Sequence, residues 1–76
     1  MKKLLNNIVT ALVDNPDDVD ITEASNDKAL AFELRVHPDD VGKVIGKKGR
    51  TINAIRTVLK AVTLKKETKV MLELLQ

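Results

Sequence analysis

The sequence contains no cysteine and a single aromatic residue, Phe32. Without cysteine the chain has neither a disulfide framework nor a zinc site built from thiolates. RRM, cold-shock and OB-fold domains stack nucleobases on several aromatic side chains, so the lack of aromatic residues argues against these classes. If the protein contacts bases at all, it must use aliphatic surface, backbone hydrogen bonds and charge.

Long apolar runs are also missing, since none approaches the ~20 residues that a membrane span needs. The first five residues, MKKLL, faintly resemble the start of a signal peptide, but Asn6, Asn7 and Asp14 interrupt the apolar stretch that should follow. An apolar share of 43% with only two prolines indicates a folded core. We expect a soluble cytoplasmic protein, with residues 1–76 forming one small domain and no contact with a membrane.

Acidic residues are absent between positions 41 and 66, where eight lysines and arginines fall. Residues 1–40 carry four basic and nine acidic side chains, a net charge of −5, whereas residues 41–76 carry nine basic and two acidic ones, a net charge of +7. An ordinary charged helix face mixes both signs, whereas a segregated positive field attracts polyanions. The second half of the chain therefore predicts a polyanion-binding site.

Glycines are few, and all three lie within eight residues, at Gly42, Gly46 and Gly49. Two lysines separate the second glycine from the third, and Arg50 follows. Glycine lets the chain turn sharply and lets a phosphate approach the main chain, while a helix that begins after Gly49 favours an anion at its first N–H groups. Gly-x-x-Gly by itself also fits a plain turn between helices, so its meaning depends on the basic segment around it.

Hydrophobic periodicity gives the architecture. Apolar residues recur at helical spacing from Leu4 to Val13, and the residue before Pro16 is disfavoured in a helix. Pro38 with two acids behind it signals another helix start. The expected elements are a helix ending at Val13, strands at 19–22 and 30–36, a short helix from Pro38 to Ile45, a longer helix from Thr51 to Val62, a polar connection over 65–69 and a strand over 70–74.

This order, with Gly-x-x-Gly between the two central helices, resembles a KH domain of the type II, or bacterial, arrangement. The implied fold is α+β, α-β-β-α-α-β, with a three-stranded sheet packed by helices on one face. The segments ALVDNP at residues 11–16 and VHPDDVGKVIG at residues 36–46 are similar to the KhpA family of small stand-alone bacterial KH proteins. The resemblance covers the whole chain.

The resemblance implies a single-stranded RNA-binding protein, an RNA chaperone or post-transcriptional regulator, whose loop clamps about four nucleotides. It implies an aliphatic groove for the bases, in which Val44 and Ile52 fit groove and core equally well and Ile45 is the better groove candidate. Arg50 is a better phosphate ligand than Arg56. Single-stranded DNA remains open, since nothing inferred demands a 2′-hydroxyl. The expected RNA-binding residues are Arg35, Val36, Val44, Ile45, Gly46, Lys47, Lys48, Gly49, Arg50, Ile52 and Arg56.

A protein interface is also expected. Small and apolar residues extend beyond the core stripe of the longer helix, at Thr57, Val58, Ala61 and Val62. With the family resemblance they predict a homodimer, or pairing with a larger KH-containing protein such as KhpB. The alternative function is an interaction module that uses the KH fold mainly for dimerisation and contacts nucleic acid only secondarily.

Catalytic sites are poorly supported. His37 precedes a proline at a helix start, which favours a capping or spacer role, and Asp39 and Asp40 fit first-turn acids that oppose the helix dipole. A Walker A loop fails because Gly42 and Gly46 enclose three residues instead of four, and a lysine stands where serine or threonine is needed. We expect no enzyme, cofactor or metal. Four further acids could suggest a metal loop, but they lack the EF-hand spacing and fit a solvated turn better. They are Asp14, Asp17, Asp18 and Asp20.

Overall fold

The computed structural model of the chain describes residues 1–64 and 67–75. Its elements follow the order that the sequence predicts and that a type II KH domain implies. Their bounds are α1 Lys2–Leu12, β1 Asp20–Ser25, β2 Ala29–Arg35, α2 Val41–Ile45, α3 Arg50–Thr63 and β3 Lys69–Leu74, with short 3-10 turns at Pro16–Asp18, Pro38–Asp40 and Lys47–Gly49. Lys65 and Lys66, which begin the expected polar connection, lie outside the described residues.

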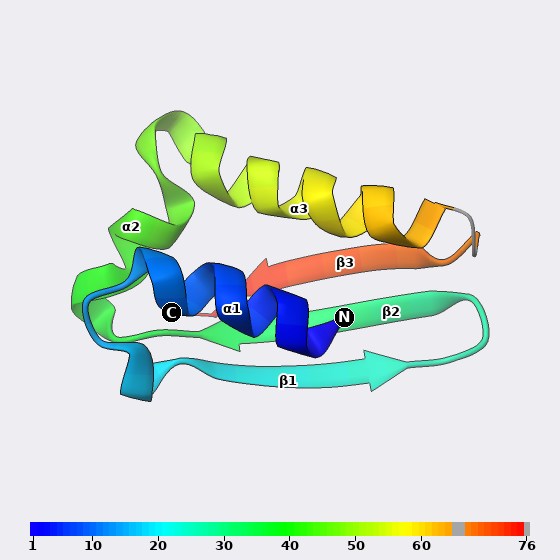
Figure 1. Ribbon diagram of the computed structural model, residues 1–76, viewed down its shortest axis with the longest axis horizontal. Helices are drawn as coiled ribbons and strands as arrows, with labels where there is room; N and C mark the ends of the chain where they lie inside the picture. Colours follow the sequence, from blue (N-terminus) through cyan, green and yellow to red (C-terminus); the bar gives the residue numbers. More distant parts are fainter. Residues whose placement is uncertain (65–66, 76) are drawn as a thin grey trace.

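The three strands form one mixed sheet in the order β1-β2-β3. β1 pairs antiparallel with β2, Ile21 opposite Leu34, and β3 pairs parallel with β2, Leu72 opposite Phe32. The helices cover one face of this sheet, with α1 and α3 both running along the strands (Figure 1). The α+β fold with helices on one face of a three-stranded sheet is therefore confirmed.

The core lies between the sheet and the helices. Phe32 and Leu34 on β2, Leu5 and Val9 on α1, and Leu59 on α3 are all 0–1% exposed. Alternate strand residues point to the same face, and residues three and four apart share one side of a helix, so the expected apolar positions meet here. Because Phe32 is buried among them, the only aromatic ring of the chain belongs to the core.

Most element boundaries lie within one residue of the predictions, and two elements differ by more. β1 extends to Ser25, three residues past the expected end, because pairing with β2 continues as far as Ser25 opposite Leu30. The expected single helix from Pro38 to Ile45 is split into a 3-10 turn followed by α2. Both differences come from tertiary pairing or local capping, which the hydrophobic pattern of the sequence does not contain.

Candidate nucleic-acid interface

The start of α2 is fixed by two side chains. The Nδ1 atom of His37 accepts a hydrogen bond from the backbone N–H of Asp39 at 3.0 Å, which confirms its capping role. Asp40 is fully buried and accepts hydrogen bonds from the backbone N–H groups of Asp14 and Asn15, at 3.2 and 3.0 Å, and from Asn15 Nδ2 at 3.1 Å. The reading of Asp40 as a first-turn acid was therefore incomplete, since its carboxylate ties α2 to the segment after α1.

Lys43 completes this cluster, since its ammonium bonds to the Asp14 carboxylate and lies 3.8 Å from Asp40 Oδ1. Burial alone would raise the pKa of Asp40, but the hydrogen bonds from Asn15 and Asp14, together with the Lys43 charge, outweigh it and hold that pKa below its usual value. The hydrogen bond to Asp14 raises the pKa of Lys43 against an opposing effect of desolvation. Lys43 belongs to the segment without acidic residues, but its charge is already paired with Asp14 within the fold.

The other end of α2 opens into the glycine loop. α2 ends at Ile45, and the N–H of its C-cap residue Gly46 bonds to the Gly42 carbonyl at 2.9 Å. Three of the next four residues have positive φ: Gly46 has φ 74° and ψ 172°, Lys48 φ 57° and Gly49 φ 75°. Residues other than glycine rarely adopt positive φ, and the Gly46 conformation is essentially restricted to glycine. Gly46 therefore starts a sharp turn that another residue could adopt there only with strain.

The first and second glycines have different roles. A Cβ on Gly46 would lie 2.8 Å from the backbone nitrogen of Thr51, closer than real Cβ atoms come, whereas a Cβ on Gly42 would meet nothing within 4 Å. Gly46 is therefore required both by its backbone conformation and by the close approach of α3. Gly42 is required by neither. The spacing of the three glycines in the sequence does not reveal this difference between Gly42 and Gly46.

The loop carries exposed positive charge. Lys47, Lys48 and Arg50 are exposed, and their side chains make no ion pair or hydrogen bond with any residue that the structure describes. The N-cap residue of α3 is Gly49, and no side chain caps this helix start. Three cationic side chains thus face solvent at the positive end of the α3 dipole, an arrangement that favours an anion.

Arg56 has a different environment from Arg50. It is half-buried, its Nε and Nη2 atoms donate to the Leu72 carbonyl at 3.3 and 3.1 Å, and Nη1 donates to Asn53 Oδ1 at 3.1 Å. These bonds tie α3 to β3. Because a guanidinium has five N–H donors, two of them remain beyond these three contacts. Arg56 is therefore a structural link first, which agrees with its lower rank as a phosphate ligand.

The expected groove floor is only partly available. Val44 is fully buried and Ile52 is 7% exposed, so in this structure both pack in the core, one of the two roles that the sequence left open for them. Ile45 is half-buried at the end of α2, directly before the loop. Of the three aliphatic candidates, only Ile45 offers apolar surface beside the glycine turn.

The two residues expected at the far edge of the groove lie at the end of the central strand. Arg35 ends β2, and its side chain is exposed on the sheet face opposite to buried Leu34, while Val36 packs against the core. The strand beside α3 is β3, to which Arg56 bonds. A role of Arg35 and Val36 in RNA binding stays a prediction.

The outer edge of β3 has free backbone groups. The N–H of Lys69 bonds to Lys28 and that of Leu75 to Leu34, so in this parallel ladder the odd-numbered residues of β3 bond to β2. The peptide groups of Val70, Leu72 and Leu74 consequently point to the outer edge, where Arg56 takes the Leu72 carbonyl. This edge faces α3 and is the side wall of any groove that begins at the glycine loop.

The expected dimer residues lie on the outer side of α3. Val58 is 43% and Val62 53% exposed, and Thr57 and Ala61 are also exposed. At 3.6 residues per turn, Val58 and Val62 occupy the flank of α3 opposite to Arg56 and Lys60. The apolar and the basic flank of this helix are therefore separate surfaces.

Among the residues that the structure describes, no group of three or more histidine, cysteine or carboxylate side chains is placed to hold a metal ion. No helix within the same residues has the length and apolar character needed to cross a membrane.

Comparison with known proteins gives one consistent family. A model of the KhpA/KhpB KH-domain family matches residues 2–74. The chain is 47% identical over 75 residues to the RNA-binding protein KhpA of Clostridium acetobutylicum, covering 99% of this chain and all of that protein. It is 49% identical over 75 residues to the protein of that name from Halalkalibacterium halodurans, covering 99% of each. The Listeria monocytogenes protein is 45% identical over the full length of both. No solved structure matches significantly.

Proposed function

The chain belongs to the KhpA/KhpB family of KH domains, and we propose that it binds single-stranded RNA with the loop from Gly46 to Arg50, acting as an RNA chaperone or post-transcriptional regulator. The relatives described above are named RNA-binding proteins. In this chain, the observation that carries the proposal is the set of exposed cations, Lys47, Lys48 and Arg50, in a turn that starts at Gly46 in a conformation essentially restricted to glycine.

The loop would hold the phosphates and the neighbouring surface the bases. Lys47, Lys48 and Arg50 supply charge, and the start of α3 supplies the positive end of its helix dipole. Ile45 provides apolar contact, and the clamp covers about four nucleotides, as in other KH domains. Because each neutralised phosphate of a single strand contributes about −0.7 to the slope of log K against log salt, two to four contacts give a shallow salt dependence.

The test is the charge of the loop. We expect Lys47→Asp with Lys48→Asp to abolish binding of a random-sequence single-stranded RNA pool, measured by fluorescence anisotropy at two salt concentrations. The thermal unfolding curve should be unchanged, because neither side chain has a partner in the fold. The matched control is Lys2→Asp with Lys3→Asp, which changes the same charge on exposed residues of α1 and should retain most of the affinity.

Two outcomes would contradict the proposal. If the loop variant binds RNA as tightly as the wild type does, the positive half of the chain is a non-specific polyanion surface and the interaction-module alternative takes its place. If the α1 variant loses as much affinity as the loop variant, net charge alone explains binding. A matched DNA pool in the same assay separates RNA from single-stranded DNA.

A second candidate role is supported by the apolar flank of α3. We propose that Thr57, Val58, Ala61 and Val62 form a homodimer interface, or the docking face for a larger KH-containing protein such as KhpB. Two exposed valines on adjacent turns are an unusual use of a solvent-facing helix surface. Because this flank lies opposite to Arg56, pairing through it leaves the loop open.

Sedimentation equilibrium tests the interface. Val58→Lys with Val62→Lys should give a monomer that keeps the RNA affinity of its single loop. The control is Met71→Lys, because Met71 is as exposed as Val62 but lies on β3. A dimer that persists in the valine variant would contradict this interface.

A further inference from the structure

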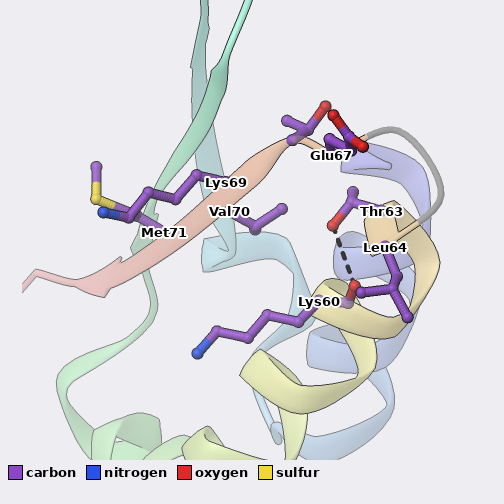
Figure 2. A pocket seen from close by; sticks show the side chains of 8 residues that line it. Lys60, Thr63, Leu64, Glu67, Lys69, Val70 and Met71 are labelled. Atoms are coloured by element: carbon purple, nitrogen blue, oxygen red, sulfur yellow. Dashed lines mark hydrogen bonds between the residues drawn. The ribbon is translucent and has the colours of Figure 1, made fainter.

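A hollow lies at the end of α3 that is remote from the glycine loop. It has a volume of about 480 Å³ and opens between the last turns of α3 and the start of β3 (Figure 2). Its lining comes from both elements and their connection: Lys60, Thr63, Leu64, Glu67, Thr68, Lys69, Val70 and Met71. None of these residues is among those assigned to RNA or to the dimer above.

One flank of α3 joins the loop to this hollow. Asn53, Arg56 and Lys60 follow Gly49 at intervals of three or four residues, so they lie on the same side of the helix. Arg56 bonds to Leu72 on β3, which shows that this side faces the outer edge of the sheet. From Gly49 to Lys60 the helix rises by about 16 Å, at 1.5 Å per residue. The polar flank and the β3 edge thus form one continuous track.

The hollow combines apolar surface with positive charge. Val70, which is 8% exposed, lies at the floor of the hollow. Leu64 is 76% and Met71 53% exposed, and both also line the hollow. Figure 2 shows Lys60 extending from α3, whereas Lys69 and Met71 leave β3 on the side opposite to Val70 and so lie at the rim of the hollow; Glu67 lies beside the connection and apart from both ammonium groups. Neither ammonium group makes an ion pair with a described residue. An apolar floor with two unpaired cations beside it suits a nucleotide. The faces of a nucleobase are apolar, and the phosphate is anionic.

We propose that this hollow is a second nucleotide subsite, which receives an RNA strand that leaves the loop and follows α3 along the β3 edge. The nucleobase contacts Leu64 and Val70 inside the hollow and Met71 across the β3 edge at its rim, and the phosphates contact Lys60 and Lys69. This inference rests on the proposed function, since the strand is delivered by the loop. It implies a binding site longer than the four nucleotides that the loop clamps.

Charge and continuity favour RNA over a protein segment. The track has no acidic residue between Gly49 and Lys60, and it starts at the three free cations of the loop. Its polar flank is also separate from the exposed valines, which are the better surface for a protein partner. An acidic peptide is the alternative occupant of the hollow. The dependence of affinity on RNA length, described next, distinguishes the two.

The experiment compares two random-sequence single-stranded RNA pools, of four and of eight nucleotides, in anisotropy titrations. We expect the wild type to bind the longer pool more tightly by more than the added binding registers explain. Lys60→Ala with Lys69→Ala should lose that gain, bind the short pool unchanged, and lower the salt slope for the long pool by about 0.7 for each lost phosphate contact. Met71→Thr should reduce the gain without changing the slope.

The control is Lys2→Ala with Lys3→Ala, whose side chains lie beside β1 at the opposite edge of the sheet and should leave the gain intact. The subsite is overturned if the Lys60/Lys69 variant binds both pools like the wild type, or if the control loses as much. The short pool reports on the loop alone, so a failure of the proposed function shows there as absent binding, whereas a failure of the subsite shows only in the difference between the pools.

Discussion

The charged residues at the two ends of α2, a helix of five residues, differ in whether they are paired within the fold. At its start Asp40 is fully buried, accepts three hydrogen bonds and lies near Lys43, which is bonded to Asp14. At its end Lys47 and Lys48 are exposed and bond to no described residue. The first cluster is complete without a ligand, and the second is not.

This difference shows how the same short element can be anchored and still offer a site. Buried polar groups must be satisfied by partners within the fold, so the Asp40 cluster fixes the position of α2 against the end of α1. Exposed lysines contribute little to folding and remain available to an anion. An anchored start gives the loop a fixed position, from which its free charges can act.

The largest expected effect comes from breaking the loop end. Gly46→Ala forces alanine into a backbone conformation that is essentially restricted to glycine and places its Cβ 2.8 Å from the Thr51 nitrogen. We expect a loss of at least about 3 kcal/mol in the free energy of unfolding, together with loss of RNA binding. Urea denaturation measures the first and anisotropy the second.

Gly42→Ala is the matched control, four residues earlier on the same helix. Its Cβ meets nothing within 4 Å and its φ is not positive, so alanine should stabilise the helix by up to about 1 kcal/mol. RNA affinity should not change. Equal destabilisation by the two substitutions would mean that glycine serves α2 as a whole and not the turn at Gly46.

The next effect breaks the anchored end. Asp40→Asn exchanges a carboxylate that accepts three hydrogen bonds for an amide, whose NH2 group replaces one of the two oxygens and confronts either the Asp14 N–H or the two donors of Asn15. We expect a fall in Tm of the order of 10 °C by scanning calorimetry. At temperatures where the variant is folded, RNA affinity should fall moderately, because the loop charges are intact but less well positioned. An unchanged Tm would show that the cluster does not anchor α2.

The same substitution gives a dependence on pH. Because the folded pKa of Asp40 is lowered, its contribution to stability is present above the ordinary aspartate pKa of about 3.9 and is lost as pH falls through the lower folded value. The Tm difference between the wild type and Asp40→Asn should therefore be constant near neutrality and shrink below about pH 4. A difference that persists unchanged in acid would contradict the role of the ionised carboxylate.

Much of this molecule follows from its sequence, for identifiable reasons. Element order and the glycine loop are local patterns, so they were predicted correctly, as was the capping role of His37. The burial of Asp40 was missed because its partner, Asn15, lies 25 residues away in the chain. The position of Arg35 on the central strand and the burial of Val44 depend on strand order and on how α2 packs, which are tertiary properties. Pairings distant in sequence are what the pattern lacks.

The smallest expected effects come from Lys43→Ala and Lys47→Ala, which remove the same charge from the two ends of α2. They therefore give the most direct comparison of these ends. Lys43→Ala should lower Tm by at most a few degrees, since Lys43 is largely exposed, and should leave the salt slope of RNA binding unchanged. Lys47→Ala should leave Tm unchanged and reduce the slope by about 0.7. The raised pKa of Lys43 means that its effect on Tm persists up to the ordinary lysine pKa of about 10.4 and fades as pH rises through the higher folded value. If both variants changed the slope equally, the positive field of the whole segment would bind RNA, and the pairing of Lys43 within the fold would have no functional consequence.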